Sequence, residues 1–167
     1  LLFTSSIAVD PSNSDNLYIA VGAPGYTAGS GIFASPDRGA TWTRINPAND
    51  IIMDGNGGFR STGERLAVDP NNPDILWFGS TQNGLYKGVK SGSTWIWTQI
   101  PATSVPFGQV PPGGNYAGVT FVACDPNNGS TIVYAGVYDS VGSTGGIYVS
   151  TNQGATWNPV AGAAVSR

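Results

Sequence analysis

The residues of this chain that could take part in chemistry are mainly carboxylates, because it contains ten Asp and Glu residues, no histidine and one cysteine. Without histidine, a Ser-His-Asp triad, a Cys-His pair or a histidine-containing zinc site cannot form within this segment. The single Cys124 lies in an apolar stretch, and we interpret it as a buried, unreactive thiol. The sequence therefore indicates no metal site and no cofactor, and leaves carboxylate acid–base chemistry or recognition of a polar ligand.

Two carboxylates lie where they could meet a ligand. Glu64, the only glutamate, follows a glycine-rich stretch. It either accepts hydrogen bonds from the hydroxyl groups of a ligand or forms an ion pair with Arg60 or Arg65, and we favour the ion pair. Asp139 ends the segment YAGVYD before another glycine-rich turn. It either contacts a ligand or is a solvated turn residue, and we favour the turn.

Three further aspartates precede proline, at Asp10, Asp69 and Asp125. They are spaced 59 and 56 residues apart, and each follows a short apolar run and precedes a polar turn and a second apolar run. Recurrence in equivalent turns indicates a structural role, in which Asp-Pro ends a strand and starts a turn.

An eight-residue string occurs twice, as SPDRGATW and as STNQGATW. A recurring pattern predicts repeat architecture. In the pattern Ser-x-Asp/Asn-x-Gly-x-Thr-Trp, the acidic or amide side chain can bind the turn backbone, the glycine permits positive φ, and the tryptophan fills a blade core. We expect structural roles for Ser35, Asp37, Gly39, Trp42, Ser150, Asn152, Gly154 and Trp157.

The middle of the chain carries an altered copy, KSGSTWIW, from Lys90 to Trp97. It keeps Gly92 and Thr94 but lacks the acidic residue. Either Trp95 or Trp97 could be the equivalent core residue, and the sequence leaves this open.

Composition predicts many short strands and tight turns. Charged residues make up only 10%, aromatic residues 11%, and there are 24 glycines and 12 prolines, so long helices are not expected. The net charge of −3, with no Lys/Arg cluster, argues against nucleic-acid or anionic-membrane partners. No apolar run reaches transmembrane length.

Each repeat unit contains four candidate strands, which in the middle unit are 65–69, 75–79, 84–88 and 95–100. Four short antiparallel strands per unit are typical of a β-propeller blade. We therefore predict an all-β fold in which residues 1–167 form a partial β-propeller of about three four-stranded blades. The units span approximately 7–45, 65–100 and 119–160. Three blades cannot close a ring, so we expect the remaining blades elsewhere in the parent chain.

Three long, glycine-rich connections, 46–65, 100–118 and 137–146, are expected at the end of the blades where propellers bind ligands. Aromatic residues on the inter-blade links, which are Phe59, Phe107 and Tyr116, can stack on the rings of a ligand or anchor the loops, whereas Trp77 is expected in the core. The candidate ligand-binding residues are Asn56, Phe59, Arg60, Glu64, Arg65, Gln82, Tyr116 and Asp139.

The stretch from Gly55 to Gly88, GNGGFRSTGERLAVDPNNPDILWFGSTQNGLYKG, resembles glycoside hydrolase family 74, in which a Gly-Glu-Arg link feeds an Asp-Pro blade. The flanking units follow that family's order. The repeated string resembles the Asp-box of sialidase-like β-propellers, which sialidases, sortilin-type receptors and photosystem assembly factors share.

The family resemblance implies a secreted enzyme that acts on xyloglucan or a related β-glucan. Family members have two seven-bladed propellers with a glucan cleft between them, and two Asp residues perform inverting hydrolysis of the β-1,4-glucan backbone. Their catalytic turns, Thr-Asp-Ile-Gly-Gly and Gly-Asp-Val-Gly-Gly, are absent from this sequence. No catalytic residue can therefore be assigned, and we expect the segment alone to be inactive.

Two alternatives stay open. The chain could belong to a non-catalytic Asp-box propeller that binds protein or glycan, or to a sialidase. A sialidase needs three arginines for its substrate carboxylate, and only Arg60 and Arg65 are expected at the ligand end.

Overall fold

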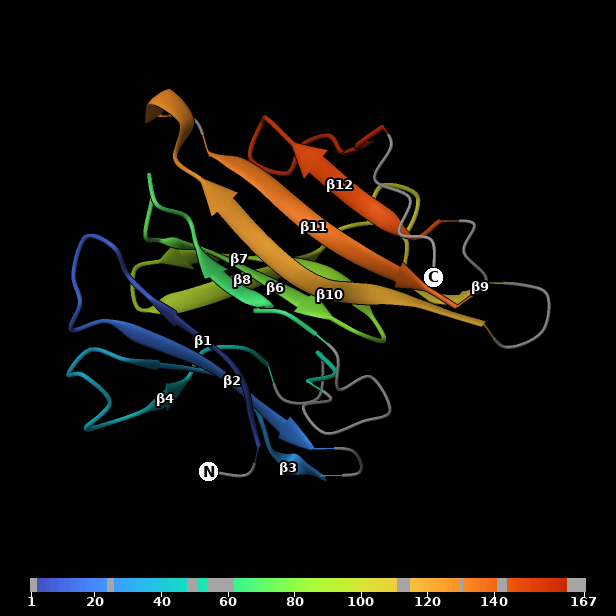
Figure 1. Cartoon of the computed structure of the whole chain (residues 1–167). Coiled ribbons are helices and arrows are strands. Elements are labelled where there is room, and N and C mark those ends of the chain that lie inside the picture. The colour runs from blue at the N-terminus through green and yellow to red at the C-terminus, as the bar shows by residue number, and fades with distance from the viewer. Residues whose placement is uncertain are drawn as a thin grey trace.

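The computed structural model describes residues 3–23, 26–47, 51–53, 62–110, 115–129, 131–140 and 144–161. In these residues the chain forms three antiparallel sheets that lie side by side (Figure 1). Each sheet is built from strands that follow one another in sequence, which makes each sheet a local unit of the chain.

The first sheet has the order β1-β2-β3-β4. Its strands are β1 (Thr4–Val9), β2 (Leu17–Ala23), β3 (Tyr26–Ser35) and β4 (Thr43–Arg44). The second sheet has the order β5-β6-β7-β8. Its strands are β5 (Leu66–Val68), β6 (Ile75–Ser80), β7 (Gly84–Ser91) and β8 (Thr94–Gln99). These four bounds lie close to those expected for the middle unit.

The third sheet has five strands in the order β13-β12-β11-β10-β9. Its strands are β9 (Gly108–Val110), β10 (Asn115–Asp125), β11 (Ile132–Asp139), β12 (Gly146–Ser150) and β13 (Asn158–Pro159). A short 3-10 helix (Asn127–Gly129) joins β10 to β11 and is the only helix among the described residues. The all-β, antiparallel prediction is confirmed, but the third sheet gains β9 from a link that we expected to be a loop.

Strand β6 of the middle sheet is buried on both faces, as its continuous apolar run requires. Successive residues of a strand point to opposite faces, and in β6 Trp77 and Phe78 both have no exposed surface. Trp77 packs in the core between the second and third sheets. Phe78 packs in the core between the first and second sheets. The expectation that Trp77 is a core residue is thus confirmed.

Adjacent sheets approach closely where β10 begins. A Cβ atom placed on Gly118 would lie 1.8 Å from the carbonyl oxygen of Thr81, in the turn between β6 and β7. Only glycine permits this contact, so Gly118 sets the distance between the second and third sheets.

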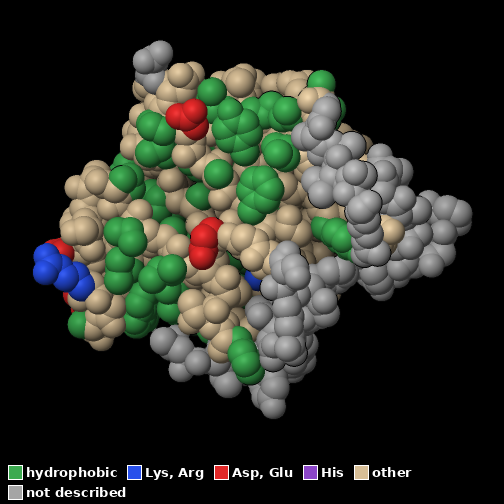
Figure 2. Space-filling model, in the orientation of Figure 1, with side chains coloured by type: hydrophobic (Ala, Val, Ile, Leu, Met, Phe, Trp, Pro, Cys, Tyr) green, Lys and Arg blue, Asp and Glu red, His purple; other side chains and the backbone are tan. Residues whose placement is uncertain are grey.

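Among the described residues, charged side chains are sparse on the face shown in Figure 2, where hydrophobic side chains lie among uncharged side chains and backbone. In β1, Ile7 and Val9 are about half exposed, at 51% and 50%. No helix in the described part of the chain is long and apolar enough to cross a membrane.

Candidate functional site

The first repeated turn, Ser35–Trp42, is closed by its own side chains. The Asp37 carboxylate accepts hydrogen bonds from the amide (2.8 Å) and hydroxyl (2.6 Å) of Thr41. The Ser35 hydroxyl donates to Asp37 and accepts from the amide of Gly39, which has φ +89°. Hydrogen bonds from Thr41 first, and then from Ser35, hold the pKa of Asp37 below its ordinary value.

The second repeated turn, Ser150–Trp157, has the same geometry with an amide in place of the carboxylate. Asn152 Oδ1 accepts from the amide of Thr156 (2.9 Å), and Asn152 Nδ2 donates to the Thr156 hydroxyl (2.9 Å). The Ser150 hydroxyl accepts from the amide of Gly154, which has φ +86°. Because the charged Asp37 and the neutral Asn152 build the same turn, we assign the turn a structural role.

The tryptophans that end these turns differ in burial. Trp157 is 9% exposed and meets Trp77 of the second sheet edge-on, with 5.9 Å between ring centroids. Trp42, which we expected to be largely buried, is only half-buried. The reason is that Trp157 packs against a preceding sheet, whereas no described residues form a sheet before the first one.

Strand register resolves the ambiguity in the middle unit. Ala34 of β3, Lys87 of β7 and Val149 of β12 are equivalent, because each pairs on one side with the aromatic residue of the preceding strand, which is Tyr18, Trp77 or Tyr134. On the other side they pair with Thr43, Thr98 and Asn158, each of which directly follows a tryptophan. The equivalent of Trp42 and Trp157 is therefore Trp97. Its indole Nε1 donates to the carbonyl of Ile45 in the first sheet (2.8 Å). Trp95 stacks on Trp97.

The Asp-Pro turns also hold their own backbone. Both carboxylate oxygens of Asp10 accept hydrogen bonds, from Ser12 and Asn13 at Oδ1 and from Asn16 at Oδ2. Burial acts to raise the pKa of Asp10, but these hydrogen bonds outweigh it and lower the pKa. Asp69 accepts from Asn71 and Asn72 in the same way. These contacts support the structural interpretation of the Asp-Pro turns.

Asp69 also joins two sheets. It is fully buried, and its Oδ1 accepts a hydrogen bond from the hydroxyl of Thr131, which precedes β11. The equivalent Asp125 of the third sheet is exposed and accepts from the amide of Asn127. Burial, with a smaller effect of Asp69, raises the pKa of the neighbouring Cys124 thiol to about 12, which fits an unreactive cysteine.

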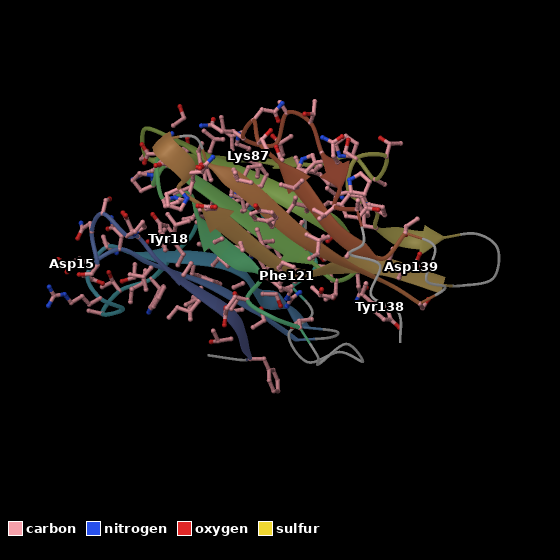
Figure 3. The ribbon with its side chains drawn as sticks, turned by 45° about the horizontal axis from the view of Figure 1, so that its top comes forward. Asp15, Tyr18, Lys87, Phe121, Tyr138 and Asp139 are labelled. Carbon is pink, nitrogen blue, oxygen red and sulfur yellow. The ribbon has the colours of Figure 1, made fainter. Side chains whose placement is uncertain are left out.

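The two ends of the sheets carry different residues. At one end the repeated turn of the first sheet meets the Asp-Pro turn, where Arg38 Nε donates to Asp15 (2.5 Å). Figure 3 shows Asp15 and Asp139 at opposite ends of the molecule. The second end contains the inter-blade links and the β11–β12 turn, and it holds those predicted ligand-binding residues whose placement is described.

Glu64 lies at this second end, is exposed, and is held by the first sheet. Its Oε2 accepts hydrogen bonds from the Ser6 hydroxyl (2.5 Å) and from the Ile7 amide (3.3 Å). Ser6 is buried, and its hydroxyl oxygen also accepts from the amides of Arg65 and Leu66 (3.0 Å each). The Ser6 hydroxyl therefore binds the Glu64 carboxylate, for which we expected an arginine as the partner.

Arg65 points away from Glu64. It is 1% exposed, and its guanidinium donates to the carbonyls of Met53 (3.0 Å) and Gly79 (3.3 Å) while lying over the Phe78 ring. The ion pair between Glu64 and Arg65 is therefore wrong, and the alternative partner Arg60 lies outside the described residues. The reason is that backbone carbonyls within the sheet take the guanidinium, whereas Glu64 faces the first sheet.

Asp139 ends β11, is 8% exposed, and holds the β11–β12 turn. Its Oδ2 accepts from both the amide and the hydroxyl of Thr144, at 2.8 Å each. Tyr148 donates its hydroxyl to the Thr144 carbonyl, and burial, then the charge of Asp139, raises the pKa of Tyr148. Asp139 is a turn-forming residue, but it is buried and hydrogen-bonded, not solvated.

The remaining predicted ligand-binding residues are only partly described. Gln82 is exposed in the β6–β7 turn, and its backbone N–H donates to the Ser80 hydroxyl. Tyr116 belongs to β10, but its side chain lies outside the described residues, as do Asn56, Phe59 and Arg60 entirely. The structure thus brings together Glu64 and Arg65 at one link, with Gln82 and Asp139 at the same end of the neighbouring sheets.

Sequence reasoning missed Ser6, which organises the Glu64 link. No local signal could have found it, because Ser6 and Glu64 are 58 residues apart and the residues that stand four positions before the aspartate in the other units are Arg65 and Phe121. Sequence reasoning also missed β9, because its three residues begin with glycine and are followed by two prolines.

A scan against protein-family models found no match. Among curated proteins, the chain is 37% identical to a probable oligoxyloglucan-reducing end-specific xyloglucanase of Neosartorya fischeri, over 97% of this chain and 18% of that protein. It is 35% identical to a xyloglucanase of Hypocrea jecorina and 38% identical to a xyloglucanase of Acetivibrio thermocellus, each over 94% of this chain and 20% of the relative. The chain thus spans about a fifth of the length of these relatives.

Solved structures of glycoside hydrolase family 74 enzymes share the fold. The chain matches the enzyme of Niastella koreensis with a TM-score of 0.75 and 32% identity, over 96% of this chain and 23% of the other. It matches the xyloglucanase of Xanthomonas campestris with a TM-score of 0.71 and 30% identity, over 95% and 23%.

Three sequential antiparallel sheets with recurring turns define part of a β-propeller. Similarity in sequence and in fold over nearly the whole chain identifies the family. The chain belongs to glycoside hydrolase family 74.

Proposed function

We propose that this chain is part of a xyloglucan-active glycoside hydrolase, to which it contributes three blades and part of the glucan-binding surface. The observation that carries the proposal is that sequence and fold agree, over almost the whole chain, with enzymes named xyloglucanases. The reaction is inverting hydrolysis of the β-1,4-glucan backbone, with the acid and the base supplied by other parts of the protein, about 6.5–9.5 Å apart.

In this proposal the ligand end of the blades binds sugar. Glu64 presents an exposed carboxylate that Ser6 holds in place, and a fixed acceptor suits recognition of a sugar hydroxyl. The link 56–65 adds Asn56, Phe59 and Arg60 to this surface, and Gln82, Tyr116 and Asp139 lie on the neighbouring connections. Arg65 supports the link from inside.

The remaining blades of the parent protein would pack against the sheet faces that are exposed here. The half-exposed Ile7 and Val9 of β1 are suitable contacts, because apolar side chains on a sheet face normally pack against a partner. We further propose that the two repeated turns are Asp-boxes and that the protein is secreted. The low charge of the chain argues against nucleic-acid and membrane partners.

The described arginines do not favour the sialidase alternative. The Arg65 guanidinium contacts backbone carbonyls and is 1% exposed, so it is not available to a substrate carboxylate. A non-catalytic propeller that binds glycan stays as the alternative that an activity assay decides.

The test uses the full-length protein that contains this chain. We expect it to release reducing ends from xyloglucan, and NMR of the first products to show the inverted, α anomer. A protein that binds xyloglucan without releasing products is a binding module, and one that neither binds nor cleaves it contradicts the proposal.

Two variants of the same protein separate the surface of the link from its support. Phe59→Ala should weaken xyloglucan oligosaccharide binding in titration calorimetry and leave the melting temperature nearly unchanged, because a stacking surface is lost. Arg65→Ala should lower the melting temperature, because two buried carbonyls lose their donor. Unchanged affinity in Phe59→Ala would assign Phe59 to the scaffold.

A further inference from the structure

We infer that Phe107 is a sugar-stacking residue, which the β6–β7 turn and β9 hold in place at the ligand end of the blades. The inference rests on the proposed function and adds a binding residue to it.

The link that carries Phe107 is folded, not loose. The amides of Ser104 and Val105 donate to the carbonyl of Pro101 at 2.8 and 3.1 Å. Val105 is fully buried two residues before Phe107. Gly108, the next residue, pairs with Ala117 as the first residue of β9. Phe107 is therefore fixed on both sides along the chain.

The ring of Phe107 packs directly against Gly84. A Cβ atom on Gly84 would lie 2.3 Å from Cδ1 of Phe107, and Gly84 has φ +89°, so no side chain stands between the ring and the backbone. This contact fixes the orientation of the ring, since the side chain cannot sink farther into the turn. Preorganised aromatic rings bind ligands at a low cost in conformational entropy.

Phe107 keeps part of its ring exposed, unlike the core aromatics of the same sheets. It is half-buried, whereas Trp77 and Phe78 have no exposed surface. An anchored ring with an accessible part is the arrangement on which the C–H groups of a pyranose can stack.

The surroundings supply polar partners for a sugar. The exposed Gln82 lies two residues before Gly84 in the same turn. The turn itself is held by the Gln99 side-chain amide, which donates to the Asn83 carbonyl (2.7 Å). Asp139 lies at the same end, because Ala117 pairs with Gly108 on one side and with Asp139 on the other. An accessible ring with an exposed amide side chain in the adjoining turn suits a glucan chain. The Asp139 carboxylate is taken by Thr144 and is not counted among the sugar partners.

The experiment measures steady-state hydrolysis of xyloglucan by the full-length protein. Phe107→Ala should raise KM about three- to tenfold at nearly unchanged kcat, because a stacking contact made equally in the ground and transition states affects binding alone. Phe107→Tyr keeps the ring and should retain the wild-type KM. Phe33→Ala is the matched control, since Phe33 is also half-buried but lies in β3, paired with Arg44.

Several outcomes would overturn the inference. They are a KM for Phe107→Ala within twofold of wild type, an equal rise in Phe33→Ala, or an equal rise in Phe107→Tyr. If Phe107→Ala does not fold, Phe107→Leu replaces it, because leucine keeps an apolar contact with Gly84 and removes the π face. If the wild-type protein has no activity on xyloglucan, the proposed function fails, and calorimetry with cellohexaose then tests Phe107. Equal affinities of wild type and Phe107→Ala, or no binding by either, would contradict stacking.

Discussion

At the scale of single residues, Asp37 and Asn152 show how two different side chains build one turn. Both accept a hydrogen bond from the backbone amide of the threonine four residues later, and both contact its hydroxyl. The carboxylate accepts from that hydroxyl, whereas the amide nitrogen donates to it. The shared requirement is an acceptor at Oδ1, because this atom closes the turn.

Replacing Asp37 tests this requirement. Asp37→Ala should lower the melting temperature by several degrees, because the Thr41 amide and hydroxyl lose their acceptor. Asp37→Asn should stay near the wild type, since Asn152 builds the same turn in the third sheet. Thermal unfolding followed by circular dichroism measures both. An Asp37→Asn variant as unstable as Asp37→Ala would show that the charge matters, not the acceptor.

The lowered pKa of Asp37 predicts a dependence on pH. A carboxyl whose pKa is lower in the folded state adds stability above its unfolded pKa, near 3.8, and loses this contribution as the pH falls through the folded value. The stability of Asp37→Asn should therefore fall less than that of the wild type between about pH 5 and about pH 2. Asp10 also has a lowered pKa and serves as the internal reference, because it titrates in both proteins. Parallel acid profiles of the two proteins would contradict this assignment.

At the scale of elements, the spacing between the second and third sheets depends on backbone contact. Gly118, at the ligand end of β10, lies against the Thr81 carbonyl, and Lys87 of β7 donates to the Gln153 carbonyl in the turn after β12 (2.8 Å). The sheets are thus joined by contacts that their own hydrogen-bond ladders do not include.

Gly118→Ala tests the close approach. Its Cβ would overlap the Thr81 carbonyl oxygen, so the sheets must separate, and overpacking of this kind costs about 1–3 kcal/mol of unfolding free energy. Gly29→Ala is the control, because a Cβ there meets nothing within 4 Å. Urea denaturation compares the two variants. Equal losses in both would mean that the spacing between the sheets tolerates a side chain at Gly118.

The elements that sequence predicted well are those whose determinants are local. The repeated turns, the Asp-Pro turns and the strands of the middle unit follow from residues a few positions apart, such as Asp37 and Thr41. The contacts that sequence could not predict join distant residues. Ser6 and Glu64 are 58 residues apart, and nothing near Glu64 reveals that a serine, not an arginine, will hold it. The identity of Trp97 as the equivalent core residue likewise needed the register of β7 and β8.

At the scale of the whole molecule, we propose that the chain contributes part of a glucan-binding surface and that the catalytic residues lie elsewhere in the protein. The described carboxylates at the ligand end, Glu64 and Asp139, are held by Ser6 and by Thr144. Each of these two carboxylates therefore has a structural role in the link or turn that contains it. Neither is assigned as an acid or a base, because the catalytic turns of the family are absent from the sequence.

We therefore expect the purified 167-residue chain not to hydrolyse xyloglucan, even where it binds the polymer. Inverting hydrolysis requires two carboxyl groups on opposite sides of the scissile bond, about 6.5–9.5 Å apart, with room for the attacking water. A reducing-sugar assay on the chain, with the full-length protein as the positive control, measures this, and circular dichroism confirms that the chain is folded. Turnover by the chain would contradict the expectation. Loss of that turnover in Glu64→Gln or Asp139→Asn would then show that this chain carries a catalytic carboxylate of its own.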